Sequence, residues 1–271
     1  IATVASITTI IDQDLSHDDG YTYEMNVSGE YYFDDFLKQG GVSSDEELIQ
    51  FITGNITKGV IPMTIKTKEI ACSSFTAWTE DQQFVFGRNY DFDETNTAIV
   101  HTNPKGRHAS VSTIDLQFLG IDEKTGITDM KEKALLLAAP YIPLDGINDA
   151  GVACGIYMTY QGEPTSPTNQ NTEKPDITST TLLRLILDYA DNVEEAIELA
   201  SQYDMHDSAG TSYHYMVADK EGNSAVLEWA GESDVTDNDG SQRAFKVTRN
   251  TQPYQVVTNF ILQPDYYPSM D

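Results

Sequence analysis

Apolar and polar residues alternate in many short runs of this chain, which is the pattern of half-buried β-strands. Residues 1–30 show it first, most clearly from Tyr21 to Val27. Further strand-like runs cover residues 99–101, 109–118, 133–139, 152–160, 213–219, 224–229, 244–249 and 255–260. Polar turns separate them, including the stretch 145–151. The chain is therefore predicted to be rich in antiparallel strands.

Apolar residues at helical spacing predict a smaller set of helices. Tyr31–Gln39 is a short candidate, and residues 43–47 contain a serine with a glutamate three positions later, which is a capping box. The helix that follows this box ends near Gly54. A strongly apolar helix opens at Thr181, and Val193–Tyr203 forms the next one. Because two helices stand between groups of strands, we predict an α+β fold with helices packed on antiparallel sheets.

A predicted hairpin brings together the first residues with chemical interest. One strand starts at Cys72, a turn follows at residues 81–82, and the returning strand ends at Gly87 with Arg88 and Asp91 just beyond. Since the two strands of a hairpin run antiparallel, the thiol meets the cation and the anion. A thiolate near fixed positive charge is an activated nucleophile.

Composition limits the classes of function. The chain has 271 residues, and 43 acidic against 16 basic residues give a net charge of −27, which disfavours nucleic acid as a partner. No window approaches the roughly 18 consecutive apolar residues of a membrane span. The chain begins at Ile1 without a methionine, which suggests a removed leader or tag and slightly favours an extracytoplasmic or secreted protein over a cytoplasmic one.

The remaining candidates for metal or redox chemistry are weak. Cys154 lies in an apolar strand and is interpreted as a core thiol. The five histidines have no metal-like spacing, and the acidic loop 237–240 lacks the glutamate that completes a calcium loop. We therefore expect no cofactor and no metal.

Four stretches, taken together and in order, resemble one known family. They are Ala71–Phe75 with Phe84–Phe92, then Asp145–Gly155, Tyr213–Glu228 and Val256–Phe260. They resemble the choloylglycine hydrolase family of bile salt hydrolases, penicillin V acylases and other linear-amide hydrolases with an N-terminal nucleophile (Ntn hydrolases). The resemblance implies a four-layer αββα sandwich of antiparallel sheets. It also implies that the bond between Ala71 and Cys72 is cleaved, so that the freed α-amine serves as the base for its own thiol.

The resemblance assigns roles to individual residues. Cys72 would be the nucleophile, Arg88 would lie near its thiol, and Asp91 would hydrogen-bond the α-amine. The side-chain amide of Asn259 would donate to the oxyanion, an interaction typically worth about 2.7–4 kcal/mol. Counting from the turn at Asn148 to a family position that holds Asn or Tyr reaches Met158. Its neighbours Tyr157 and Tyr160 are included with it as substrate-binding candidates.

The resemblance also divides the chain. Residues 1–71 would be a propeptide or a retained α-subunit, as in acid ceramidase-like members, and residues 72–271 would be the catalytic domain. The family's late arginine has no counterpart, because no arginine follows Arg249. We expect residues 72–271 to be C-terminally incomplete, although the arginine could instead be on another chain or its role unfilled.

We therefore expect a cysteine amidohydrolase that cleaves a small linear amide with an apolar acyl group through an acyl-thioester. A bile acid conjugate, a phenoxyacetyl-type amide and an N-acyl lipid all remain candidates, and a homo-oligomer stays open. The alternative is a catalytically silent or unprocessed acidic binding protein on the same fold. A papain-like protease fits less well, because its nucleophile starts a helix and needs a histidine partner.

Overall fold

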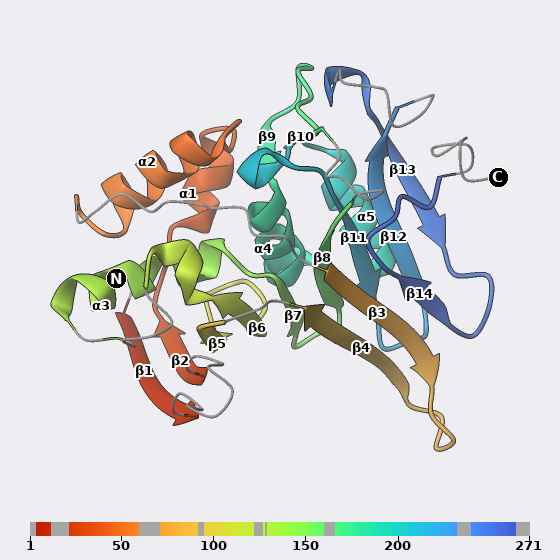
Figure 1. Cartoon of the computed structure of the whole chain (residues 1–271), viewed down its shortest axis with the longest axis horizontal. Helices are drawn as coiled ribbons and strands as arrows, with labels where there is room; N and C mark the ends of the chain where they lie inside the picture. The colour runs from red at the N-terminus through yellow and green to blue at the C-terminus, as the bar shows by residue number, and fades with distance from the viewer. Residues whose placement is uncertain are drawn as a thin grey trace.

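The structure is a computed structural model, and it describes residues 4–11, 22–59, 71–91, 95–121, 127, 129–159, 166–231 and 240–263. Figure 1 shows the course of the chain. The helices within this part of the chain are α1 (Phe33–Lys38), α2 (Asp45–Asn55), α3 (Met130–Leu135), α4 (Ser179–Tyr189) and α5 (Val193–Ser201), with the 3-10 helices η1 (Leu116–Leu119), η2 (Leu136–Tyr141), η3 (Ser208–Gly210) and η4 (Gly240–Gln242). None of these helices is long and apolar enough to cross a membrane.

A nine-stranded sheet forms the centre of the molecule. Its order is β1-β2-β5-β6-β7-β8-β11-β12-β13, and every neighbouring pair is antiparallel except β2 and β5. The strands are β1 (Val4–Ile11), β2 (Thr22–Ser28), β5 (Thr97–Thr102), β6 (Ser110–Asp115), β7 (Asp145–Asn148), β8 (Ala153–Met158), β11 (Tyr213–Ala218), β12 (Ser224–Ala230) and β13 (Ala244–Arg249).

Two smaller sheets complete the described strands. A three-stranded antiparallel sheet has the order β14-β3-β4, built from β3 (Ala71–Trp78), β4 (Phe84–Asp91) and β14 (Gln255–Val257). A separate parallel pair consists of β9 (Asp176–Thr178) and β10 (Asp204–His206). The predicted hairpin from Cys72 to Asp91 is confirmed, with Ala71 opposite Asp91 and Ser74 opposite Arg88.

The central sheet is covered on both faces because its middle strands are apolar on both sides. Along β8, Ile156 and Met158 belong to the main core, in which α4 and α5 also pack, whereas Tyr157 belongs to a second, smaller core with Cys72. In Figure 1 the three-stranded sheet lies in front of β11 and β12. The helix α5 packs against β11 and β12, and α4 packs against β7 and β8. The predicted α+β class with facing antiparallel sheets is confirmed, and the described residues form a helix layer and two sheet layers.

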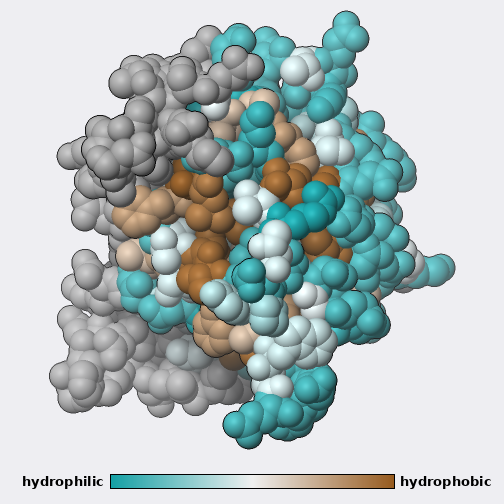
Figure 2. Space-filling model, turned by 90° about the vertical axis from the view of Figure 1, so that its right-hand side faces the viewer, coloured by the Kyte–Doolittle hydropathy of each residue, from teal (hydrophilic) through white to brown (hydrophobic). Residues whose placement is uncertain are grey.

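The outer face of the three-stranded sheet carries exposed apolar side chains. Figure 2 shows hydrophobic residues gathered at the centre of the face on the right of Figure 1, with hydrophilic residues around them. Phe75 and Val256, which lie opposite each other, are the exposed large apolar residues of this outer face. Exposed apolar residues nearby are Trp78 at the end of β3, Tyr254 just before β14, and Phe260 and Leu262 after it. Within the described part of the chain, no helix covers this face.

The segment before Cys72 shares the main core with the rest of the chain. The rings of Phe33, Phe36 and Phe51 pack around Tyr141, with centroid separations of 5.7, 5.8 and 5.9 Å. The serine cap predicted for α2 is present, because Ser44 accepts a hydrogen bond from the Glu47 amide at 3.2 Å. The full capping box is not formed, since the Glu47 carboxylate accepts from the amide of Ser43 and not from that of Ser44. Residues 22–59 are therefore not a separate unit with a core of its own.

A buried charge cluster also ties this segment to the rest. The hydroxyl of Tyr31 donates to both carboxylate oxygens of Asp188, at 2.7 and 2.8 Å. Arg107 joins Asp188 at 3.2 Å and Glu30 at 2.8 Å, and Arg184 holds Asp188 at 2.8 Å. The side chains of Asp188 and Arg184 are fully buried. A buried carboxylate needs such partners, since an unpaired one would be strongly destabilising.

Two predicted elements are wrong. Residues 133–139 are not a strand, because Asp129 caps a helix by accepting from the amides of Lys131 and Glu132, and α3 and η2 follow. A short apolar run fits a buried helix as well as a strand, so the pattern could not decide. The predicted turn at 145–151 begins as a strand, β7, and turns only after Asn148.

Candidate active site

Cys72 lies near the start of β3, on the face that packs against the central sheet. The alternation of β3 turns Cys72, Ser74 and Thr76 inward, with 4%, 3% and 0% exposure, and turns Phe75 outward with 49%. The neighbours of Cys72 in this small core are Tyr157, Met216, Val226 and Val257, with Phe86 and Tyr90 at its margin. The thiol is therefore enclosed between the two sheets.

Arg88 lies beside the thiol and is fixed from several sides. Its Nη2 is 3.9 Å from Sγ of Cys72 and donates to the carbonyl of Ile156 at 2.5 Å. Its Nε pairs with Asp145 at 3.2 Å. The guanidinium also stacks between Tyr90 and Tyr157, 4.3 Å from each ring centroid.

The charge balance around the thiol is dominated by burial. Burial raises the pKa of Cys72 to about 11, the Arg88 guanidinium lowers it, and the carboxylates of Asp91 and Asp145 raise it further. Because the thiolate is the reactive form of any cysteine, a thiol with this pKa is almost entirely in its unreactive protonated form at neutral pH. Among the described residues, Arg88 is the cation that opposes the rise in the Cys72 pKa.

Asn259 touches the nitrogen of Cys72. Its Oδ1 accepts a hydrogen bond from the Cys72 backbone amide at 2.8 Å, and its Nδ2 donates to the carbonyl of Met158 at 2.6 Å. The carbonyl can only accept, so this contact fixes which end of the Asn259 amide faces Cys72. Within the described part of the chain, the second hydrogen of Nδ2 has no acceptor.

Asp91 and Ala71 face each other across the hairpin. Asp91 is exposed, and its carboxylate accepts from the side chain of Asn89 at 2.8 Å. Because paired residues of a hairpin point to the same face, Asp91 and Ala71 belong to the face opposite Cys72. The Cys72 nitrogen is thus hydrogen-bonded to Asn259, and Asp91 lies opposite Ala71, the residue before Cys72.

The three substrate-binding candidates have different positions. Tyr157 is fully buried against the thiol, and its hydroxyl donates to Ser74 at 2.5 Å. Burial raises the pKa of Tyr157 to about 12, with Arg88 opposing it. Met158 contacts the site through its backbone carbonyl, while its side chain packs in the main core. Tyr160 lies outside the described residues.

A cavity adjoins the site on the side of Arg88. Its volume is about 360 Å³, and Arg88, Tyr90 and Asp145 form the wall nearest the thiol. The rest of its lining is Thr95, Thr97, Thr113, Ile114, Asp115 and Leu144. Hydroxyls and aliphatic groups thus share a space of the size that binds small molecules.

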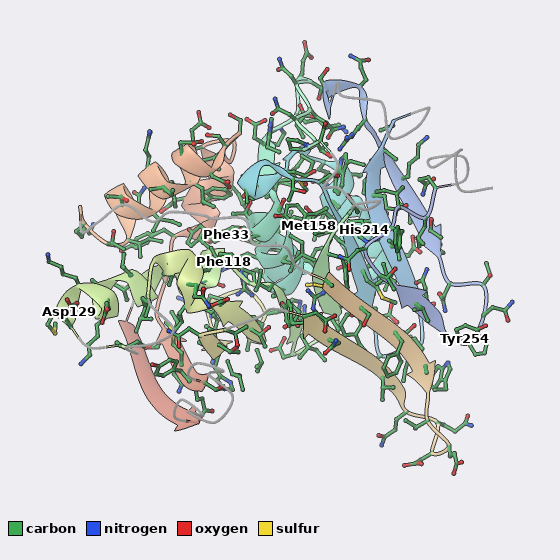
Figure 3. The ribbon with its side chains drawn as sticks, in the orientation of Figure 1. Phe33, Phe118, Asp129, Met158, His214 and Tyr254 are labelled. Carbon is green, nitrogen blue, oxygen red and sulfur yellow. The ribbon has the colours of Figure 1, made fainter. Side chains whose placement is uncertain are left out.

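Sequence reasoning missed several residues of this site. Asp145 was assigned to a turn, although it holds the guanidinium of Arg88. His214 and Glu228, both fully buried, face the same intersheet space as Cys72, and Figure 3 shows His214 beside Met158 on neighbouring strands. A signal was present, because a histidine and a glutamate in otherwise apolar strands need buried partners. Among the described residues, no group of three or more His, Cys, Asp or Glu could hold a metal ion.

These features define a layered α+β protein in which two facing sheets enclose a cysteine, an arginine and an asparagine. Residues 72–260 match the family of linear amide C–N hydrolases known as the choloylglycine hydrolase family. Because the match covers more than half of the 271 residues, the chain belongs to this family.

Solved structures give more distant matches. A variant of conjugated bile acid hydrolase from Clostridium perfringens is 19% identical with a TM-score of 0.45, over 68% of this chain and 52% of that one. Penicillin V acylase from Agrobacterium tumefaciens is 15% identical with a TM-score of 0.36, over 72% of this chain and 47% of that one. The chain thus spans about half the length of these proteins. No curated protein matches the sequence significantly.

Proposed function

We propose that this protein is a cysteine amidohydrolase that cleaves a linear amide with an apolar acyl group, and that cleavage before Cys72 activates it. The observation that carries the proposal is that Cys72 is held at both its backbone nitrogen and its thiol. Its backbone nitrogen is hydrogen-bonded to Asn259 at 2.8 Å, and its thiol lies 3.9 Å from the Arg88 guanidinium. Family membership supports the same reaction class.

The first step is cleavage of the chain by its own thiol. The sulfur attacks the carbonyl carbon of Ala71, and the C–N bond to Cys72 breaks as the nitrogen gains the proton that the thiol has lost. Water then hydrolyses the resulting thioester. Its hydroxyl goes to the carboxyl group of Ala71, and its hydrogen returns to the sulfur. The products are a chain ending at Ala71 and a free α-amine on Cys72.

The new α-amine then serves catalysis from the place that the amide nitrogen occupied. An α-amine has an unperturbed pKa of about 7.7–8.0, so it can take the thiol proton near neutral pH. The thiolate attacks the substrate carbonyl. The amine part of the substrate then leaves with the proton that the protonated α-amine of Cys72 returns. Water releases the acid from the acyl-thioester. Asp91 is proposed to turn towards the α-amine once the bond to Ala71 is cut.

Asn259 and Arg88 are proposed to stabilise charge during these steps. One hydrogen of the Asn259 amide is committed to Met158, and the other is available to the oxyanion of the tetrahedral intermediate. Arg88 favours the thiolate electrostatically, since its guanidinium lowers the pKa of Cys72 against the effect of burial. We propose the cavity beside Arg88 and Tyr90 as the place for part of the substrate.

We further propose that the segment before Cys72 stays bound after cleavage, as an α-subunit and not as a discarded propeptide. Three of its aromatic rings, those of Phe33, Phe36 and Phe51, are part of the main core. Its Tyr31 satisfies the buried carboxylate of Asp188. Removing the segment would expose this apolar surface and leave that carboxylate without one of its partners.

Intact mass under denaturing conditions tests the proposal most directly. We expect two fragments with a break before Cys72, which elute together under native conditions. The Cys72→Ala variant should remain one chain and should hydrolyse none of a panel of bile acid conjugates, phenoxyacetyl amides and N-acyl amines. Cys72→Ser should cleave slowly and hydrolyse poorly. Hydrolysis by Cys72→Ala at the wild-type rate would overturn the mechanism.

The second candidate is a catalytically silent acidic protein on the same fold. The burial of Cys72, 4% exposed with a pKa of about 11, favours it for the uncleaved chain. This candidate predicts a single intact chain, no hydrolysis of any amide in the panel, and no alkylation of Cys72 at neutral pH. The amidohydrolase predicts the reverse of the first two results.

A further inference from the structure

We propose that His214 and Glu228 form a buried clamp that positions Asn259 for catalysis. The kinetic test of this inference rests on the proposed function, and the hydrogen-exchange test rests on the structure alone. The clamp acts through the backbone on either side of Asn259. His214 and Glu228 are therefore positioning residues, and neither touches the nucleophile.

The sheet register brings the pair together between the two layers. His214 on β11 lies opposite Glu228 on β12 and opposite Tyr157 on β8. The side chains of His214 and Glu228 are both fully buried. The imidazole also packs edge-on against the ring of Tyr157, with centroids 5.7 Å apart. The clamp therefore stands on two adjacent strands, β11 and β12, and packs against a residue of a third, β8.

The clamp holds the chain on both sides of Asn259. Nε2 of His214 lies 2.6 Å from the carbonyl of Thr258, the residue just before Asn259. Glu228 accepts hydrogen bonds from the Leu262 amide at 2.7 Å and from the Gln263 side chain at 2.8 Å. The bond of 2.9 Å between Nδ1 of His214 and Oε1 of Glu228 joins the two halves.

This anchorage matters because regular structure ends just before the site residue. β14 stops at Val257, and residues 258–263 form neither strand nor helix. Asn259 must nevertheless keep its amide between the Cys72 nitrogen and the Met158 carbonyl. A misplacement of about 1 Å at a catalytic group can lower a rate about 10²-fold. The clamp supplies the fixation that the short strand does not.

The hydrogen-bond inventory fixes the direction of the critical contact. A carbonyl oxygen only accepts, so Nε2 of His214 carries the hydrogen that Thr258 receives. Glu228 receives hydrogens from Leu262 and Gln263, and its Oε1 also forms the hydrogen bond to Nδ1 of His214. A buried network of this kind is stable only when every member is satisfied.

The test compares two amides at position 214, which keep different halves of the clamp. A glutamine amide extends as far as Nε2 of the imidazole, so His214→Gln can still donate to Thr258. An asparagine amide extends only as far as Nδ1, so His214→Asn can bond Glu228 and loses Thr258. The matched control is His206 in β10, a buried histidine that binds Asn169 at 2.7 Å and the carboxylate of Asp176 at 2.8 Å.

The kinetic outcome follows from the contact that each variant keeps. We expect His214→Asn to lower kcat about 10²-fold with KM within a few-fold, because Asn259 acts on the oxyanion and not on bound substrate. His214→Gln should lose less than about 10-fold. His206→Asn and His206→Gln should stay within about three-fold of wild type. Equal losses in the two His214 variants, or equal losses at positions 214 and 206, would overturn the proposal.

Two further measurements keep the test decisive. If His214→Asn does not fold, the isosteric variant Glu228→Gln replaces it in the kinetic test. We expect this variant to have an about 10-fold lower kcat at unchanged KM, and a wild-type kcat would count against the clamp. Hydrogen exchange in the inert Cys72→Ala background needs no activity. There, His214→Asn should speed exchange of the backbone amide of residue 72, which donates to Asn259, at least ten-fold, and His206→Asn should not. If wild type neither cleaves nor hydrolyses, the proposed function fails, while unchanged exchange in His214→Asn refutes the clamp itself.

Discussion

Gly155 on β8 makes room for Arg88, and adding one methyl group there should displace the guanidinium. A Cβ at position 155 would stand 2.2 Å from Nη1 and 3.1 Å from Cζ of Arg88, and 2.9 Å from the hydroxyl of Tyr157. Favourable contact needs about 3.5 Å, so Nη1 has to move by more than about 1 Å. Gly155 has no unusual backbone requirement, and the conflict is one of space alone.

Arg88 cannot make this movement without losing a partner. The guanidinium is held at 3.2 Å by Asp145 and at 2.5 Å by the carbonyl of Ile156, and it stacks between two rings. We expect Gly155→Ala to lower kcat/KM about 10²-fold through misplacement of Arg88. Overpacking should lower the free energy of unfolding by about 1–3 kcal/mol. The pKa of Cys72 should rise further, since Arg88 opposes the effect of burial.

Three measurements check this prediction: denaturant unfolding, the rate of cleavage before Cys72 by intact mass, and the rate of Cys72 alkylation at fixed pH. Gly54→Ala in α2 is the matched control, because a Cβ there meets nothing within 4 Å. It should stabilise the helix by up to about 1 kcal/mol and leave both rates unchanged. Wild-type rates in Gly155→Ala would refute the role assigned to Arg88.

Three further predictions follow from buried groups. Before cleavage, the rate of Cys72 alkylation should rise with pH up to about pH 11, because burial raises the pKa of the thiol to about 11. A rate profile with its midpoint near pH 9 would contradict this. Asp188→Ala should lower the free energy of unfolding by about 3–5 kcal/mol, since Arg184 and Arg107 lose their buried partner; urea titration measures it. Burial raises the pKa of Asp207 from 3.8 to about 6, so its contribution to stability is full below about pH 4 and is lost as pH rises through about 6. Relative to wild type, Asp207→Asn should therefore gain roughly 3 kcal/mol between pH 4 and pH 7 in urea titrations, and a parallel pair of stability profiles would show that this pKa is not raised.

Local patterns were enough to predict the hairpin and its chemistry. The alternation from Cys72 onwards and the turn before Phe84 required only neighbours in sequence, and they placed the thiol near Arg88. The serine cap of α2 was equally local, with Ser44 and Glu47 three residues apart.

Contacts between distant strands could not be predicted in the same way. Asp145 reaches Arg88 only because β7 and β4 belong to sheets that face each other. His214 and Glu228 become a pair only through the register of β11 with β12. Asp129 caps α3 and thereby overrides an apolar run that alternation made strand-like. The resemblance to a family named residues of the site, but no pattern along the chain could supply their partners.

The parallel pairing of β2 with β5 has a consequence for the order of events in the life of the protein. β2 precedes Cys72 and β5 follows it, so a cut before Cys72 turns neighbouring strands of one sheet into strands of two polypeptides. Before the cut they meet within one molecule, at an effective concentration that a tether keeps in about the millimolar range. Afterwards, denaturation would separate them, and recovery would depend on protein concentration. On the proposed mechanism, the enzyme assembles once, and its lifetime is governed by how slowly it unfolds.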